Sequence, residues 1–148
     1  MQKSTTLDLK EGWSTLGLLI LLVAIAAVAI MQAELTAGTH ILPIISTLAI
    51  VTGLLLAKSR FSANTAHLFA VVYGLFMVFY LVGTTLPLEL SWHERVLNMI
   101  ARQADWFQKA FGGGTSRDGL VFVVQTAVVF WLLGYTAAWY TFRKPRIW

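Results

Sequence analysis

Long runs of apolar residues, separated by short polar segments, dominate the chain. Four of these runs are long enough to cross a bilayer, because about 20 residues rising 1.5 Å each span the hydrocarbon. They cover residues 15–33, 40–57, 65–86 and 119–141. A membrane β-barrel would instead need alternating segments of about 9–11 residues, and an open sheet would leave backbone groups unpaired in lipid. We therefore expect an all-α integral membrane protein with four transmembrane helices.

One further segment, residues 91–111, repeats at helical spacing without being apolar throughout. Its apolar positions recur every three or four residues: Trp92, Val96, Met99, Ile100, Phe107 and Phe111. Polar positions recur on another face: Asn98, Arg102, Asp105 and Lys109. Ser91 followed by Glu94 has the spacing of a capping box, and Gly112 stands where a helix terminator belongs. We expect an amphipathic helix lying in the outer membrane interface; a lid packed against the bundle or a partner is the alternative.

Basic residues are distributed as membrane topology requires. If the N-terminus is cytoplasmic, that side holds seven of the eleven Lys and Arg residues: Lys3, Lys10, Lys58, Arg60, Arg143, Lys144 and Arg146. This excess follows the positive-inside rule, so both termini are predicted to be cytoplasmic. The formal net charge of +4 then reflects topology, and nucleic acid is not an expected partner. The expected partners are the lipid bilayer and other membrane protein subunits.

Aromatic and basic residues near the predicted span ends are expected at the membrane interface. Trp and Tyr prefer that depth because an apolar ring meets a wet polar tip there. The residues predicted to lie at the interface are Trp92, Phe107, Trp139, Arg143, Lys144, Arg146 and Trp148.

The chain is 57% hydrophobic and only 12% charged, about half the charge of a soluble domain. The first run could be a signal peptide, but Asp8 and Glu11 precede it and it is long for that purpose, which favours an uncleaved helix. No internal repeat or low-complexity linker separates the runs. Residues 1–148 are therefore interpreted as one four-span domain.

The stretch "FGGGTSRDGLVF", residues 111–122, has the composition of a phosphate-binding loop but not its pattern. A P-loop needs Lys directly after its last glycine, where Leu120 follows Gly119. A dinucleotide fingerprint needs a final glycine where Arg117 stands, and both need a preceding strand. No nucleotide is expected here.

The same stretch is instead predicted to be a hinge between two helices. Its glycines end the amphipathic helix and permit a reversal, Thr115 or Ser116 caps the next span, and Asp118 lies in the first turn, where a carboxylate complements the helix dipole. The residues assigned to this hinge and cap are Gly112, Gly113, Gly114, Ser116 and Asp118.

The sequence offers few residues that could act in catalysis or bind a cofactor. Without cysteine there is no thiol nucleophile or thiolate metal ligand, no serine–histidine–carboxylate arrangement can be assembled, and no metal site is expected. His40 and His67 are weak candidates for haem or bacteriochlorophyll ligands, because paired ligation needs two histidines at one depth on facing helices. Ionisable residues are lacking in the middle of the spans, which disfavours a channel or transporter. We expect neither an enzyme nor a bound cofactor.

The fourth run resembles the N-terminal membrane region of bacterial transglutaminase-like membrane proteins. The residues that carry the resemblance are Gly113, Gly114, Ser116, Asp118, Leu120, Phe122, Trp131, Leu132, Leu133, Tyr135, Ala137, Trp139, Phe142, Arg143 and Trp148. Residues 11–13 and 54–60 are also similar to that family. Members of that family continue into further spans and a domain with Cys, His and Asp. Residues 1–148 contain no counterpart of that domain, so no catalytic residue is carried over. The resemblance implies a module of the bacterial cytoplasmic membrane.

The sequence therefore predicts a non-catalytic membrane scaffold or accessory subunit of a larger bacterial membrane assembly. The alternative is a histidine-ligated haem or bacteriochlorophyll subunit of an electron-transfer or light-harvesting complex.

Overall fold

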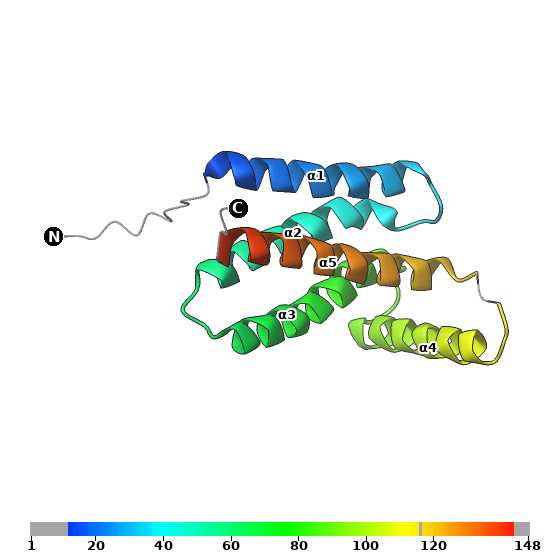
Figure 1. The fold of residues 1–148 in the computed structure, drawn as a ribbon. Coiled ribbons are helices and arrows are strands. Elements are labelled where there is room, and N and C mark those ends of the chain that lie inside the picture. The colour runs from blue at the N-terminus through cyan, green and yellow to red at the C-terminus, as the bar shows by residue number, and fades with distance from the viewer. Residues whose placement is uncertain (1–11, 116, 144–148) are drawn as a thin grey trace.

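The structure is a computed structural model that describes residues 12–115 and 117–143. This part of the chain forms five α-helices and a short 3₁₀ turn, and contains no strand (Figure 1). The elements in chain order are α1 (Trp13–Gln32), η1 (Thr39–Ile41), α2 (Leu42–Lys58), α3 (Ala63–Gly83), α4 (Trp92–Phe111) and α5 (Gly119–Arg143). Among the described residues, four helices are long and apolar enough to cross a membrane: α1, α2 with the turn before it, α3 and α5. The all-helical, four-span prediction is confirmed at this level.

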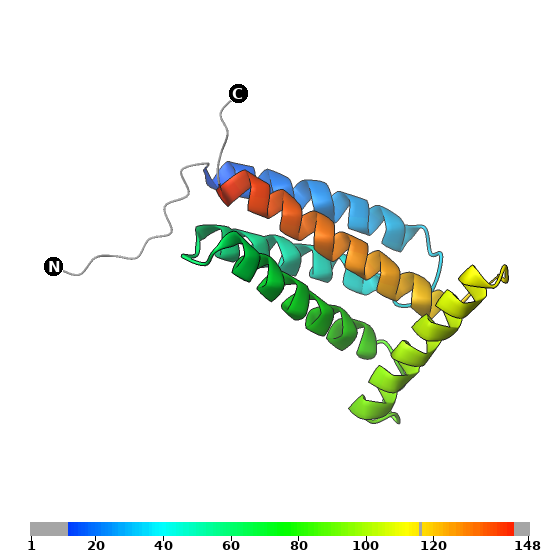
Figure 2. The ribbon, with the colours of Figure 1, turned by 60° about the horizontal axis from the view of Figure 1, so that its bottom comes forward.

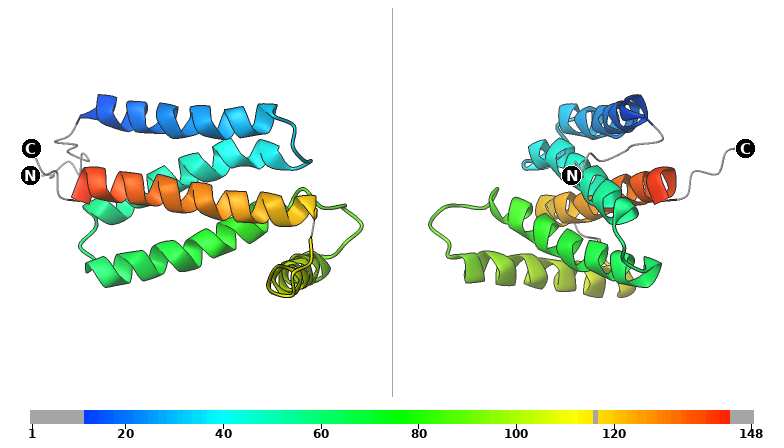
Figure 3. Two further views of the ribbon diagram at one scale, coloured as in Figure 1. Left: turned by 45° about the vertical axis from the view of Figure 1, so that its right-hand side comes forward. Right: turned by 90° about the vertical axis from the view of Figure 1, so that its left-hand side faces the viewer.

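Helices α1, α2, α3 and α5 run side by side, and α4 runs across them. Figure 2 shows α4 at a steep angle to the other four, and the left view of Figure 3 looks along its axis. It lies at the end of the bundle where α1 and α3 finish and where α2 and α5 begin, which we call the α4 end. At the opposite end, α1 and α3 begin and α2 and α5 finish.

The helix boundaries lie within a few residues of those predicted, with the largest shift at the end of α3. The third run was predicted to continue to residue 86, but α3 ends at Gly83. The Thr84 and Thr85 hydroxyls donate to the carbonyls of Leu81 and Val82, at 2.6 and 2.8 Å. Side chains that bond to nearby carbonyls offer the backbone an alternative to the helix. Pro87 then follows, and has no N–H to extend it.

The closest helix pair is α2 with α5, which make the most extensive contact in the bundle. Two glycines permit it. A methyl group at Gly53 would lie 2.7 Å from the backbone oxygen of Tyr135, and one at Gly134 would lie 2.9 Å from the backbone oxygen of Ser46. Small residues at such crossings allow the backbones of membrane helices to approach closely.

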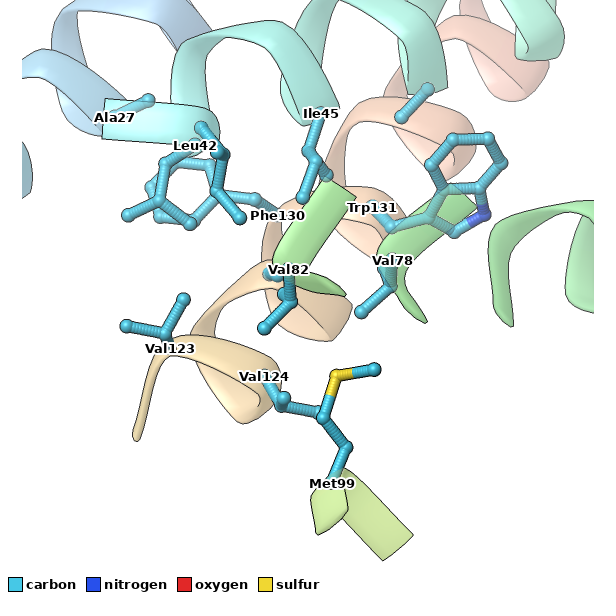
Figure 4. Packing of buried hydrophobic residues seen from close by; sticks show 13 residues of the cluster. Ala27, Leu42, Ile45, Val78, Val82, Met99, Val123, Val124, Phe130 and Trp131 are labelled. Carbon is cyan, nitrogen blue, oxygen red and sulfur yellow. The ribbon is translucent and has the colours of Figure 1, made fainter. Parts of the chain in front are cut away.

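The buried core joins all five helices around this pair. Its members include Ala27 of α1, Ile45 of α2, Val78 of α3 and Trp131 of α5 (Figure 4). Met99 of α4 is fully buried in the same cluster, and Figure 4 shows its side chain directed toward Val124 and Val82. The transverse helix is therefore part of the packed core.

Helix α1 is the least integrated element. Ala27 is its one buried residue, whereas Leu18, Leu22 and Ile25 are exposed. Such exposure costs little in a bilayer, because lipid tails are as apolar as the side chains they cover. The outer face of α3 is similarly apolar.

We expect Gly53→Ala to destabilise the bundle, because the added methyl meets backbone atoms that cannot rotate away. Overpacking of this kind costs about 1–3 kcal/mol. The matched control is Gly17→Ala, where nothing lies within 4 Å of the new methyl and the better helix propensity of alanine is gained instead. Thermal unfolding followed by circular dichroism in detergent should show a lower midpoint for the first variant alone. Equal midpoints would contradict the close-packing argument.

Candidate functional site

The most distinctive arrangement in the molecule is the attachment of α4 across the end of the bundle. Its first turn carries the predicted capping box, which is confirmed. Ser91 Oγ accepts from the backbone N–H of Glu94 at 3.4 Å, and Glu94 Oε2 accepts from the Ser91 N–H at 2.8 Å. The hydrogen bonds from the Ser91 hydroxyl and N–H hold the pKa of Glu94 below its usual value of 4.5. The start of the helix is therefore defined by its own sequence.

Arg95 fixes α4 to the end of α3. Its side chain is only 6% exposed, its Nη1 donates to the Gly83 carbonyl at 3.0 Å, and its Nε donates to the Leu90 carbonyl at 2.9 Å. Gly83 is the last residue of α3, where carbonyls lack helical partners and the helix dipole favours a cation. The buried guanidinium thus bridges two helices without a carboxylate.

Trp92 reinforces the same junction. Its ring stacks on Tyr80 of α3, with centroids 5.2 Å apart, and the Arg95 guanidinium lies 5.1 Å from its centroid. A methyl at Gly83 would come within 2.6 Å of the indole, so the absence of a side chain there lets the ring sit against α3. The predicted interfacial residue Trp92 is therefore a contact between helices as well as a partly exposed ring.

The glycine run ends α4 as predicted. Gly112 N–H donates to the Gln108 carbonyl at 2.9 Å, and Gly114 N–H donates to the Lys109 carbonyl at 2.8 Å. Gly113 between them has φ +77°, a backbone conformation that glycine adopts without strain. The Gly114–Lys109 bond is the longer of the two bonds of a Schellman helix end, in which the left-handed residue follows the cap.

Asp118 caps α5. Thr115 or Ser116 was predicted to cap and Asp118 to lie in the first turn; Ser116 is outside the described residues. Helix α5 begins at Gly119, which puts Asp118 directly before it. Its Oδ1 accepts from the N–H groups of Leu120 and Val121 at 2.9 and 3.4 Å. The assignment to Thr115 was wrong because that residue is too far from the first turn.

Arg102 of α4 closes the hinge by pairing with the same carboxylate. Its Nη1 lies 3.2 Å from Asp118 Oδ1 and 3.3 Å from Oδ2. A partly exposed pair of this kind contributes at most about 1 kcal/mol. The pair ties the middle of α4 to the residue that caps α5, so the helices on both sides of the hinge are held together.

The attachment leaves part of the apolar face of α4 uncovered. Met99 points into the core, but Ile100, Phe107 and Phe111 remain 50%, 49% and 88% exposed, and Phe107 stacks on Phe111. On the polar side, Lys109 pairs with Asp105, as their spacing predicted. The apolar face is therefore wider than the contact with the bundle requires.

The histidines lie in three separate places. His67, near the start of α3, has its Nδ1 2.8 Å from the Tyr135 hydroxyl of α5 and its ring 4.8 Å from that of Trp139. His40 is exposed in η1 at the α4 end, and His93 is exposed on α4. His40 and His67 thus lie at opposite ends, which rules out paired ligation between them. The described residues contain no group of three His, Cys, Asp or Glu that could hold a metal ion.

Two of the predicted interface residues at the opposite end, Trp139 and Arg143, have partners inside the protein. Trp139 is buried, and the Arg143 guanidinium lies 5.0 Å above its ring. Arg143 also donates to the carbonyls of Ala57, Ser59 and Phe61, at 3.1, 2.9 and 2.7 Å. It therefore closes the α2–α3 connection, and its contact with lipid stays a prediction. Lys144, Arg146 and Trp148 lie outside the described residues.

Two residues that attach α4 to the bundle were not distinguished by sequence reasoning. Arg95 and Arg102 were assigned to no site, yet they tie α4 to α3 and α5. A pattern could have indicated Arg95: on a helical projection it lies beside the apolar stripe that holds Met99, and an arginine there can reach the carbonyls of a helix end. Its partner at Gly83 depends on the turn between the helices, which no spacing rule predicts.

Comparison with known proteins gives no match to a family model, to a curated protein or to a solved structure.

We expect the first turn of α4 to loosen in acid. Because folding lowers the pKa of Glu94, its capping contribution is present above the unfolded value and is lost as the pH falls through the folded pKa, below 4.5. Amide hydrogen exchange at residues 92–95, corrected for the intrinsic rate, should speed up between pH 5 and about pH 3. Glu94→Gln should remove that dependence while keeping the side-chain shape. A wild-type response equal to that of Glu94→Gln would contradict the assignment.

Proposed function

We propose that this chain is a non-catalytic scaffold or accessory module of a larger bacterial membrane assembly, and that it presents α4 to a partner at the outer surface. The observation that carries the proposal is the attachment of α4. Arg95, Trp92 and Arg102 tie the helix to two spans, while Ile100, Phe107 and Phe111 stay exposed. A rigidly held helix with an uncovered aromatic face is suited to docking, because little ordering entropy remains to be lost on binding.

The transverse direction of α4 supports an interfacial location. An amphipathic helix that runs across a bundle of spans lies in the plane of the membrane surface, where its apolar side meets the acyl boundary. Charge supports the orientation: Lys58, Arg60 and Arg143 lie at the opposite end, which the positive-inside rule makes cytoplasmic. On this proposal both termini are cytoplasmic and the α4 end faces outward from the bacterial inner membrane. The resemblance to the membrane region of transglutaminase-like proteins agrees with such a module.

The alternative, a histidine-ligated pigment or haem subunit, rests on His67. Its Nδ1 is engaged by Tyr135, and its Nε2 has no hydrogen bond to the described residues. Ligation of a metal by Nε2 would require the tautomer in which Nδ1–H donates to the Tyr135 hydroxyl, as metal-ligating histidines donate their other ring N–H. A visible absorption band in the purified protein, lost in His67→Ala, would favour this function over the scaffold.

Photo-crosslinking on α4 tests the scaffold function. A benzophenone amino acid at Phe107 should give a discrete protein adduct in intact membranes, identified by mass spectrometry. The same group at Gln108, which is exposed on a different side of the same turn, is the matched control and should give little of that adduct. Adducts only with lipid at Phe107, or the same protein adduct at both positions, would contradict docking through this face.

The proposed orientation predicts opposite labelling of the two ends. The chain has no cysteine, so an introduced thiol is unique. In intact spheroplasts, Thr115→Cys near the α4 end should react with an impermeant maleimide, and Asn64→Cys at the opposite end should react only after permeabilisation. Both positions are exposed, so access across the membrane decides the result. The reverse labelling pattern would show that the α4 end faces the cytoplasm and would contradict the proposed orientation.

A further inference from the structure

A groove between α3 and α5 opens on the side of the bundle and is not used by the scaffold function. Two hollows, of about 200 and 210 Å³, share Val71, Trp131 and Leu132 as lining residues and so adjoin one another along this groove. Its buried floor consists of Ala70, Gly74, Val78, Trp131 and Tyr135. Its exposed walls include Val71 and Leu75 on one side and Leu132 and Thr136 on the other.

Trp131 shapes the floor of this groove. Its indole Nε1 donates to the Ala70 carbonyl at 3.1 Å, which holds the ring across the face of α3. The ring covers Gly74, where any side-chain carbon would collide with it. The floor is thereby flat and apolar, and its polar N–H is already satisfied.

His67 forms the polar end of the groove. Its Nδ1 lies 2.8 Å from the Tyr135 hydroxyl, and this buried hydroxyl has no other hydrogen-bond partner among the described residues. A phenolic O–H needs an acceptor, and in the neutral ring only the unprotonated nitrogen can provide one. The proton of the neutral imidazole therefore resides on Nε2. If the ring is charged, both nitrogens carry protons.

In either state, Nε2–H is a donor without a protein partner at the mouth of an apolar groove. Thr136, the other polar wall residue, donates its own hydroxyl to the Leu132 carbonyl at 2.6 Å and so offers no competing donor. An occupant must therefore bring an acceptor, such as a carbonyl oxygen, together with a long apolar chain.

The length and depth of the groove match one leaflet of a bilayer. From His67 to Val78, α3 rises about 16 Å, roughly half of a hydrocarbon core about 30 Å thick. His67 lies about one turn inside the start of α3. At that depth, the head of an acyl chain from the leaflet at the opposite end of the bundle would lie beside the imidazole.

We propose that the α3–α5 groove is a specific phospholipid site, in which one acyl chain lies over Trp131 and Gly74 and its ester carbonyl accepts a hydrogen bond from His67 Nε2. Tyr135 is a positioning residue that holds the proton of His67 on the nitrogen facing the lipid. The site lies at the other end of the bundle from the exposed face of α4, so the two proposals stand or fall separately.

Binding of ester and ether lipids to the purified protein tests the site. The probes are phosphatidylglycerols with two sixteen-carbon chains, linked to glycerol either by esters or by ethers, and retention in detergent is measured by native mass spectrometry. The wild type should retain the diester about tenfold better than the diether, because the ether form leaves Nε2–H unpaired. In His67→Phe, which keeps a ring but has no donor, the preference should disappear.

A second variant tests the groove without altering His67. Leu132→Trp extends an exposed wall residue over the groove and should weaken retention of both lipids. Leu68→Trp, on the exposed face of α3 outside the groove, is the matched control and should leave retention unchanged. Circular dichroism checks that each variant keeps its helical content.

Three results would overturn the proposal. Equal retention of diester and diether by the wild type would show that the ester carbonyl does not bind His67. A preference for the diester that persists in His67→Phe would show the same. An isoprenoid quinone with a two-unit tail that displaces the diester in a His67-dependent manner would show that a quinone carbonyl, not a phospholipid ester, occupies the site.

Discussion

Helices in a bilayer gain little from burying apolar surface against one another, because the surrounding lipid chains are equally apolar. Van der Waals packing between closely spaced backbones is one of the stabilising terms that remain, and in this molecule it is concentrated between α2 and α5. Gly53 and Gly134 each leave space that the other helix fills with backbone atoms. Helices α1 and α3 then pack on the sides of this pair, and the groove of α3 with α5 and the seat of α4 both depend on where α5 lies.

Hydrogen bonds at the two ends of the bundle complement this close packing, and at each end an arginine donates them. Arg95 donates to the last carbonyl of α3, and Arg143 donates to three carbonyls around the connection from α2 to α3. Carbonyls at helix ends lack intrahelical partners and carry partial negative charge, so a guanidinium with several donors can satisfy more than one. Each arginine also lies over a tryptophan, Trp92 or Trp139. The molecule thus uses the same chemistry at both ends to fix the turns between helices.

Hydropathy sufficed to predict the spans because each is a single long apolar run, and α4 followed from its repeat and capping box. Features that depend on contacts between distant residues could not be predicted in the same way. His67 meets Tyr135 68 positions away, and nothing in the spacing of either residue indicates the pair. Asp118 was expected in the first turn of α5 and is its cap instead, since the cap lies two or three residues later than the Thr115 or Ser116 that was predicted. For Arg95, periodicity indicates the face of the helix but not the carbonyls that it meets.

The first turn of α4 places two kinds of polar contact next to each other. Glu94 holds the turn through a carboxylate that gains a proton in acid, whereas Arg95 holds the helix to α3 through carbonyl oxygens, which have no proton to gain or lose in that range. Guanidinium is charged throughout the accessible pH range. Protonation of Glu94 can therefore release the beginning of the helix while its junction with α3 persists, so the shape of α4 and its attachment to the bundle respond to acidity independently.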